Sequence, residues 1–496
     1  MIMKTKVLSA LCFSFLLSAS LYAQEPLSQD MVKQVDKIAA MIKDNPDAAE
    51  DAFDELLKGK NKKNVSLLVA IGRAYLNNDK IDAAKEFAEK ARKADSKNGE
   101  SYVLQGDIAL SVKDVGTACG YYEQAILFDE DCFDAYYKYA NAYIGVNPQL
   151  SVNMLLKLKE KYPTEIRVDR ELANAYYQMG SYGKAKQVFD EYMQKGQPDV
   201  QDYSRYSMLL YLNKDYAQSL EMVNKGLAME ADNHLLKRLK MYDLYETKAY
   251  AEGIQASDVF FADPNNPDFV YMDYLYRARL YAANNEIDKA MVEFDKAMKL
   301  DEKGEHPEIS KEASEAQQKA QNYPEAIRLY QQYLDGMKDK AEVTDLFMFG
   351  RLYYMAAGAL STPVVADSTQ TEAPIVATVD SIQLKAYLIE ADTIFAQVAE
   401  RVPDNYLGNF WRARTNAMLD PETTQGLAKP YYEKALAILE ENPKASKNVL
   451  IECESYLGYY YFLKEEYEQS KVYWEKILAI DPENATAKQA LEGLQP

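Results

Sequence analysis

The residues that most often build metal and catalytic centres are scarce in this chain. Among its 496 residues there are only 2 His and 4 Cys. His234 and His306 are far apart in the sequence, and no HExxH, CxxC or GxxxxGK[ST] pattern occurs. We therefore expect no metal site, no cofactor and no catalytic residue, so that the protein is not an enzyme. The alternative is a hydrolase whose catalytic residues come from distant parts of the sequence, although no nucleophile-elbow motif is present.

Basic residues are outnumbered in this chain. Its 57 Lys and Arg face 77 Asp and Glu, which gives a formal net charge of −20. A protein this acidic repels nucleic acid and anionic lipid surfaces. We therefore expect no nucleic-acid partner.

Long apolar runs are missing except near the start of the chain. Residues 7–21 are apolar apart from a few serines, two lysines precede them, and Ala23 follows. This order is typical of an export signal that is cleaved after a small residue. The apolar run is about 15 residues long, shorter than the roughly 20 that a membrane-spanning helix needs. We expect residues 1–23 to be a signal peptide and the protein to be periplasmic or associated with the outer envelope. A retained anchor helix is the alternative.

Export to an oxidising compartment makes the remaining cysteines informative. Cys119 and Cys132 lie at opposite ends of one predicted helix, about 20 Å apart, whereas a disulfide needs Cα atoms within about 7 Å. Cys453 is distant from both in the sequence. We predict three unpaired, buried thiols; a disulfide between two molecules is the alternative.

A small residue recurs along the chain at intervals of 34 residues, first at Gly72, Gly106 and Ala140. Gly72 is followed by Tyr75 and then by Ala84, and comparable spacings return later. Residues three or four apart share a helical face, so each interval predicts two helices joined by a short polar turn. Small residues at the crossing allow the two helices to approach closely.

This spacing resembles that of tetratricopeptide-repeat (TPR) proteins. Eleven units are recognised, led by Gly72, Gly106, Ala140, Ala173, Ser207, Met241, Ala278, Ser314, Gly350, Ala413 and Gly458. The resemblance implies an all-α fold, a right-handed α-solenoid (superhelix) of about eleven TPR-like helix pairs with capping helices. The units led by Met241 and Ser314 depart most from the pattern.

The repeats suggest the following organisation after the signal. Residues 24–64 are expected to form an N-terminal capping helix pair, and residues 65–484 the TPR superhelix. The spacing from Gly350 to Ala413 is longer than one repeat, and we place a mobile insertion at residues 359–383, where Thr, Ser, Val, Pro and Ala are frequent. Residues 485–496 are expected to form a C-terminal capping helix.

The resemblance also places the first helix of each unit on the concave face. Eight arginines occupy positions that flank the small residue of a first helix: Arg73, Arg167, Arg170, Arg205, Arg238, Arg279, Arg351 and Arg414. Arginine binds carboxylates and stacks on aromatic rings. The alternative is that each arginine pairs with an acidic residue of an adjacent repeat, such as Glu171 or Asp107. We predict a groove for a partner segment formed by Arg170, Arg205, Arg238, Tyr242, Tyr276, Arg279, Arg351, Tyr354, Trp411 and Arg414.

A protein-interaction scaffold or adaptor in the cell envelope is the function that these patterns favour. Its expected partners are other proteins or peptides, within an envelope complex. The alternative is a glycan-binding or glycan-handling envelope protein with a TPR-like helical core, since aromatic side chains suit sugars.

Overall fold

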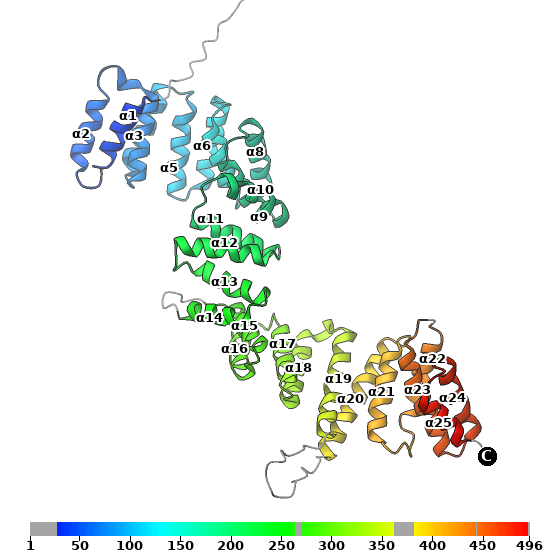
Figure 1. Cartoon of the computed structure of the whole chain (residues 1–496). Coiled ribbons are helices and arrows are strands. Elements are labelled where there is room, and N and C mark those ends of the chain that lie inside the picture. Colours follow the sequence, from blue (N-terminus) through cyan, green and yellow to red (C-terminus); the bar gives the residue numbers. More distant parts are fainter. Residues whose placement is uncertain (1–26, 263–268, 362–380, 443, 495–496) are drawn as a thin grey trace, which may run out of the picture. The chain divides into compact units, whose positions relative to one another are not determined.

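A computed structural model describes residues 27–262, 269–361, 381–442 and 444–494 (Figure 1). Within these ranges all regular secondary structure is helical, as the repeat pattern predicts. The expected signal peptide at residues 1–23 lies outside the described residues. So does most of the expected insertion at residues 359–383, whose two ends belong to helices.

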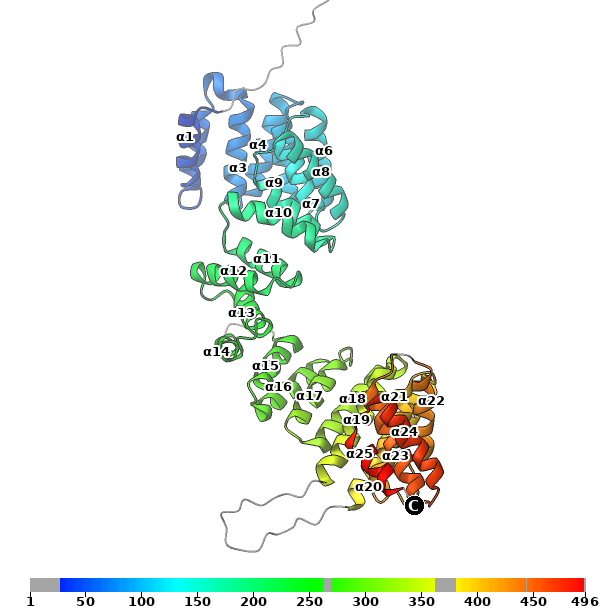
Figure 2. The same cartoon turned by 45° about the vertical axis from the view of Figure 1, so that its right-hand side comes forward.

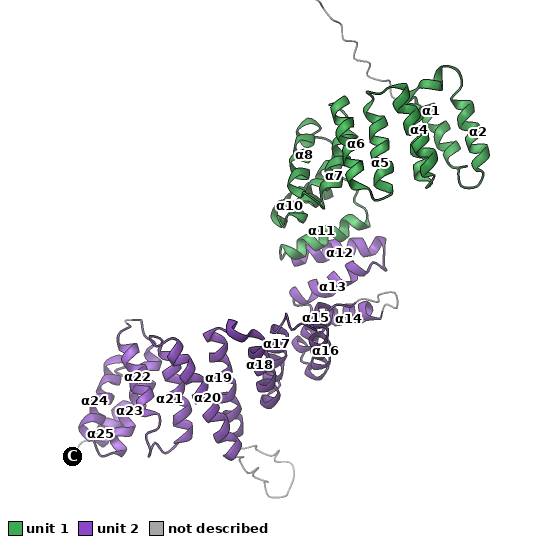
Figure 3. Cartoon of the chain, turned by 180° about the vertical axis from the view of Figure 1, so that it is seen from behind, with its two compact units in different colours: residues 1–215 green, residues 216–496 purple. Residues whose placement is uncertain are grey.

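The chain divides into two compact units, residues 1–215 and 216–496 (Figure 3). The spacing of the repeats does not indicate this division. The helices of unit 1 are α1 (Gln29–Ala39), α2 (Pro46–Leu56), the 3-10 helix η1 (Gly59–Lys63), α3 (Val65–Asn77), α4 (Ile81–Ala94), α5 (Gly99–Ser111), α6 (Val115–Phe128), α7 (Phe133–Tyr143), α8 (Pro148–Lys161), α9 (Arg167–Gln178), α10 (Tyr182–Lys195) and α11 (Val200–Leu212).

Unit 2 continues the same alternation of helices. Its elements are α12 (Tyr216–Met229), α13 (His234–Glu246), α14 (Tyr250–Phe261), α15 (Tyr271–Ala283), α16 (Ile287–Leu300), α17 (Glu308–Lys319), α18 (Tyr323–Met337), the 3-10 helix η2 (Lys338–Lys340), α19 (Val343–Ser361), α20 (Ser381–Arg401), α21 (Tyr406–Leu419), α22 (Lys429–Glu440), α23 (Lys447–Leu463), α24 (Tyr467–Ile480) and α25 (Ala485–Gly493).

Ten of the eleven leading residues lie on the first helix of a consecutive packed pair, such as α3–α4 or α15–α16, which confirms these predicted helix pairs (Figure 2). The eleventh, Ser207, lies on α11, the last helix of unit 1. Close packing explains why these residues are small. A Cβ atom added to Gly106 would lie 2.4 Å from Cε1 of Tyr122, and one added to Gly350 would lie 2.7 Å from Cε1 of Phe395. The aromatic ring of the second helix therefore occupies the space that a side chain on the first helix would need.

The repeat led by Met241 shows how a departure from the pattern is accommodated. Met241 is fully buried on α13. Gly253 stands on α14 where an alanine is expected, and a Cβ there would lie 2.4 Å from Cδ2 of Leu280 on α15. The small residue is therefore required at the contact with the next repeat.

In several helix pairs, the turn that joins the two helices contains a residue with positive φ, in the left-handed region of backbone conformation. Gly180 has φ +69°, but Asp79, Lys113 and Lys248 have φ 60°, 63° and 64° at corresponding turns. Residues with a Cβ atom are disfavoured there, so these turns store a small strain.

The three cysteines that follow residue 23, Cys119, Cys132 and Cys453, are buried and unpaired, as predicted. Burial raises the pKa of Cys132 to about 11 and that of Cys453 to about 12. These thiols are therefore protonated and unreactive at neutral pH. Among the described helices, none combines the length and apolar character that crossing a membrane requires.

Candidate binding surface

Ion pairs join the first helices of consecutive repeats; we call them the inter-repeat ion pairs. They are Lys138–Asp107 and Arg170–Asp202 in unit 1, and Arg238–Asp273, Arg279–Glu312, Lys311–Asp345 and Arg414–Glu452 in unit 2. Those of Arg238, Arg279 and Arg414 are bidentate, with N–O distances between 2.6 and 3.0 Å. The positive charge of one repeat is thus neutralised by an adjacent repeat.

Three of the carboxylates, Asp202, Asp273 and Asp345, occupy the third position of their helices and are buried. Each also accepts a hydrogen bond from the backbone amide that precedes the helix; for Asp273 this donor is Val270 N, at 2.9 Å. The Tyr242 hydroxyl donates to Asp273 as well, at 2.7 Å. One buried carboxylate therefore caps its helix and binds the preceding repeat at the same time.

The pKa of Asp345 shows the electrostatic effect of its pairing with Lys311. Burial favours the neutral form of Asp345, but hydrogen bonds from Lys311 (2.8 Å) and the Glu342 amide (3.1 Å) lower the pKa of this carboxyl below its usual value. Asp345 is therefore ionised at neutral pH, and the pair keeps both charges.

The inter-repeat ion pairs engage most of the predicted groove arginines. Arg170, Arg238, Arg279 and Arg414 each bind a carboxylate of the next repeat. These arginines therefore pair with acidic residues of an adjacent repeat, and they have little donor capacity left for a partner. Arg205 differs, because it is exposed and forms no ion pair within the described part of the chain.

Two further arginines on first helices, Arg73 and Arg167, also lie close to carboxylates. Arg73 lies 3.8 Å from a carboxylate oxygen of Asp134, and Arg167 binds the neighbouring Glu165 at 2.9 Å.

Two of the predicted aromatic residues belong to the core. Tyr242 and Tyr276 are buried, and their rings stack at 4.0 Å between centroids. The Tyr276 hydroxyl donates to Glu246 at 2.7 Å. Because both rings are covered by the protein itself, we do not retain them as contact residues for a partner.

The step from α19 to α21 lacks an inter-repeat ion pair, unlike the other steps between the first helices α13, α15, α17, α19, α21 and α23 in the described part of unit 2. Gly408 stands at the third position of α21, where α15 and α19 carry an aspartate. A Cβ at Gly408 would lie 2.6 Å from the backbone nitrogen of Ala399 on α20, so no acidic side chain fits there. Arg351 lies directly after the leading residue of its helix, as Arg279 does. Arg279 binds Glu312, and the position of α21 that corresponds to Glu312 is Trp411. Arg351 therefore meets an indole where Arg279 meets a carboxylate.

Arg351 instead belongs to a group of partly exposed side chains that we call the Trp411 cluster: Phe347, Arg351, Tyr354, Trp411 and Arg414. The guanidinium carbons of Arg351 and Arg414 lie 5.4 and 5.2 Å from the Trp411 ring centroid. Tyr354 and Phe347 meet the same indole edge-on, at 5.2 and 5.9 Å. The Nε atom of Arg351 is buried and has no hydrogen-bond partner among the described residues.

Beside this cluster lies Met348, whose side chain is 42% exposed. The nearest polar contact of Arg351 is a weak one, from Nη1 to the Met348 sulfur at 3.8 Å. The surface therefore combines the unneutralised guanidinium of Arg351, an indole near it, and an exposed thioether. Such a surface suits a carboxylate that lies next to an apolar side chain.

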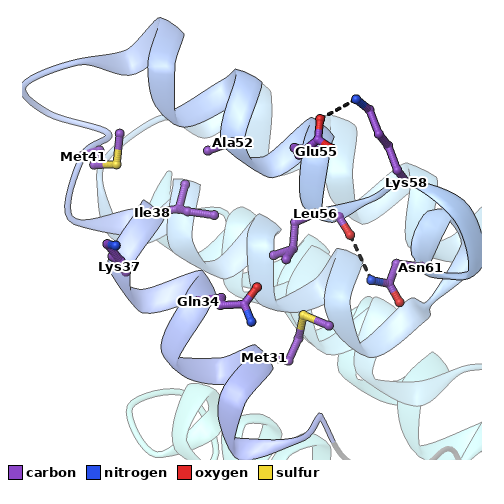
Figure 4. A pocket seen from close by; sticks show the side chains of 10 residues that line it. All are labelled: Met31, Gln34, Lys37, Ile38, Met41, Ala52, Glu55, Leu56, Lys58 and Asn61. Carbon is purple, nitrogen blue, oxygen red and sulfur yellow. Dashed lines mark hydrogen bonds and ion pairs between the residues drawn. The ribbon is translucent and has the colours of Figure 1, made fainter.

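Unit 1 also contains pockets in its described part. One of about 600 Å³ lies between α1 and α2, and Met31, Ile38, Met41 and Leu56 are among its lining residues (Figure 4). A second of about 680 Å³ lies nearby, and five lysines are among its lining residues.

The two histidines have ordinary surroundings. His306 stacks on Tyr271 at 4.2 Å, and its Nδ1 lies 3.1 Å from Glu308. His234 begins α13. Across the described ranges, no group of three or more His, Cys, Asp or Glu is arranged to hold a metal ion.

Comparison with known proteins gives one family match, to the tetratricopeptide repeat, over residues 65–98. Curated proteins give no match. Among solved structures, the C-terminal part of a TPR repeat-containing protein from Cytophaga hutchinsonii is 24% identical, covers 58% of this chain and 99% of its own, and has a TM-score of 0.46.

Two further solved structures are also similar to parts of the chain. YrrB, described as a TPR protein with an unusual peptide-binding site, is 16% identical over 37% of this chain and 95% of its own, with a TM-score of 0.31. A tetratricopeptide repeat protein from Parabacteroides merdae is 14% identical over 55% of this chain and 94% of its own, with a TM-score of 0.28.

Proposed function

We propose that this tetratricopeptide-repeat protein uses the Trp411 cluster to hold an extended segment of a partner protein, and that it acts as a scaffold or adaptor in the cell envelope. The family match and the helix pairs support a protein-interaction scaffold in general. The particular surface is proposed from one observation. Among Arg279, Arg351 and Arg414, which each follow the leading residue of a first helix in unit 2, only Arg351 has no acidic partner among the described residues.

The chemistry of the cluster indicates what the segment contains. A free guanidinium binds a carboxylate through two parallel hydrogen bonds, which favours an Asp, a Glu or a chain terminus. Trp411 and Tyr354 offer apolar surface beside it, which favours an aromatic or aliphatic side chain next to the acid. The overall charge of −20 disfavours acidic partners at long range, so recognition depends on this local positive site.

The binding experiment places a photo-crosslinking amino acid at Met348, on the rim of the cluster. Its control carries the same group at Val292, which is exposed on the second helix α16. Each protein is expressed in its native host and irradiated, and the crosslinked peptides are identified by mass spectrometry. We expect a discrete set of partner peptides from position 348 that is absent from position 292.

A charge reversal then tests the role of Arg351. Arg351→Glu is expected to remove the crosslinks at position 348 by repelling the acidic residue of the segment. Arg328→Glu makes the same charge change on an exposed residue of α18 and is expected to leave them intact. Crosslinks that persist in Arg351→Glu at the wild-type level would rule out the proposed surface.

The envelope location is a separate part of the proposal, and it rests on the apolar run at residues 7–21. Cell fractionation and N-terminal sequencing test it. We expect a periplasmic or outer-envelope protein that begins at Gln24; a cytoplasmic protein that retains residues 1–23 would contradict it. The comparisons give no support to the glycan-binding alternative, and we do not propose it.

A further inference from the structure

One short stretch of this acidic chain is strongly basic. Residues 58–97 contain eleven Lys and Arg but only five Asp and Glu, a net charge of +6. Since the whole chain carries −20, the remainder carries −26. The stretch covers η1, α3 and α4 of unit 1.

Five of these eleven basic side chains line the pocket of about 680 Å³ beside η1, which we call the lysine pocket. It is lined by Lys58, Lys62, Lys63, Lys90 and Lys93. Its apolar lining comes from Leu57, Leu68 and Ala94, and Asp54 is the one acidic residue among those that line it in this described region. The site therefore combines several cations with an apolar surface.

Two of these lysines have no acidic partner among the described residues. Lys90 pairs with Glu86 at 2.8 Å, Lys93 lies 3.6 Å from Glu89, and Lys58 is bound by Glu55. Lys62 and Lys63 are exposed and form no ion pair within the described ranges. Their charges are available to a ligand, and like charges this close favour the arrival of an anion.

The backbone that carries these two lysines is held in place. The side-chain amide of Asn61 donates from Nδ2 to the Leu56 carbonyl at 3.0 Å, and Figure 4 shows this bond beside the Lys58–Glu55 pair. Asn64 caps α3 by accepting from the Leu67 amide at 3.0 Å. Little ordering is therefore required of this segment when a ligand binds.

We propose that the lysine pocket binds an acidic polypeptide segment in which carboxylates flank one apolar side chain. The carboxylates meet Lys62, Lys63 and Lys93, and the apolar side chain meets Leu57 and Leu68. A concave pocket with apolar lining suits an inserted segment better than a flat bilayer. An anionic membrane is an extended surface that also faces the acidic remainder of the chain, which carries −26, whereas a short peptide meets mainly the local lysine site. This site is independent of the Trp411 cluster.

The probe is a fluorescent synthetic peptide with the sequence Glu-Glu-Leu-Glu-Glu at its centre. Its binding to the full-length protein is measured by fluorescence anisotropy at 50 mM salt. We expect Lys62→Glu/Lys63→Glu to weaken binding at least tenfold, and 0.5 M salt to weaken wild-type binding strongly because exposed charges are screened. Lys62→Arg/Lys63→Arg is expected to retain binding, which separates charge from folding.

Lys80→Glu/Lys85→Glu is the matched control, because it makes the same charge change on exposed residues that do not line the lysine pocket. It is expected to alter affinity less than twofold. Equal losses in the two variants, or no binding of the peptide by the wild type, would overturn the proposal.

Two further arms identify the ligand class. A peptide with Ser in place of Leu is expected to bind several-fold more weakly; equal affinity would exclude the apolar contact. Vesicles of phosphatidylglycerol and phosphatidylcholine are expected not to bind. Vesicle binding that is lost in Lys62→Glu/Lys63→Glu, without peptide binding, would replace the proposal with a membrane site.

Discussion

Removal of the buried carboxylate of Asp273 is expected to destabilise unit 2 severely. Asp273 is 0% exposed and accepts hydrogen bonds from Arg238 at 2.7 and 3.0 Å, Tyr242 at 2.7 Å and Val270 N at 2.9 Å. Asp273→Ala leaves all these donors without their partner. Breaking a buried ion pair by removing one partner costs about 3–5 kcal/mol. We expect the free energy of unfolding to fall by that amount.

Removal of the Arg238 cation is expected to lower the free energy of unfolding by a smaller amount. After Arg238→Ala the carboxylate keeps its bonds from Tyr242 and Val270, so we expect a loss of about 1–3 kcal/mol. The double variant should then show a coupling energy of at least about 1.5 kcal/mol between the two residues. The exposed Arg328–Glu325 pair is the control, and its coupling is expected to be below about 0.5 kcal/mol.

The assay is urea unfolding followed by tryptophan fluorescence. The chain has 2 Trp, Trp411 and Trp474, and both belong to unit 2, so the signal reports that unit. A cost below about 1 kcal/mol for Asp273→Ala would show that the inter-repeat ion pairs do not bind the repeats together, and would refute the reasoning.

Three further predictions concern single residues. Burial raises the pKa of Asp243 to about 7, so the protein loses up to about 4 kcal/mol of stability as pH rises from about 4 to above 7. We expect Asp243→Asn to abolish this loss, as measured by urea unfolding at pH 4 and pH 8. Gly106→Ala, which meets the Tyr122 ring, should lower the melting temperature and cost about 1–3 kcal/mol. Lys248→Gly, at φ 64°, should raise stability in the same assay by about 0.5–1 kcal/mol.

The sign of the Asp243 effect follows from the direction of its shift. Below about pH 4 the carboxyl is neutral in both states, whereas between pH 4 and 7 only the unfolded chain ionises freely. Asp232→Asn, on an exposed carboxyl, is the control and should change stability by less than about 0.5 kcal/mol at both pH values. An equal effect of Asp243→Asn at pH 4 and 8 would contradict the assignment.

Matched variants also exist for the other two predictions. Gly120 lies inside α6 with nothing within 4 Å of an added Cβ, so Gly120→Ala should stabilise by about 0.5–1 kcal/mol while Gly106→Ala destabilises. Gly180→Ala, at φ +69°, should destabilise where Lys248→Gly stabilises. Effects of the same sign within either pair would contradict the packing or the backbone argument.

The helix pairs could be predicted from the sequence because their determinants are local. The interval between Gly72 and Gly106 sets the length of one repeat, and the spacing of small and aromatic residues sets the helical faces. The turn strain at Lys113 and Lys248 could not be predicted in this way. Lysine has no preference for the left-handed region, so only the backbone shows that these residues adopt it.

The interacting surface was harder to predict because it depends on contacts between repeats. From the sequence, Arg238 and Arg351 are both predicted groove residues. In the structure, Arg238 binds Asp273, whereas the Nε atom of Arg351 has no hydrogen-bond partner among the described residues. A usable signal was present: an acidic residue lies 32 to 35 positions after Arg170, Arg238 and Arg279. For the lysine pocket, the sequence shows the basic excess of residues 58–97 but not that these lysines meet, because they come from both η1 and α4.

The most direct test of the proposed docking surface is hydrogen exchange on the full-length protein with and without the partner segment identified by crosslinking. Occupation of the Trp411 cluster should slow the exchange of backbone amides in α19 and α21, and Arg351→Glu should abolish that change. Protection confined to other helices, with α19 and α21 unchanged, would contradict the account.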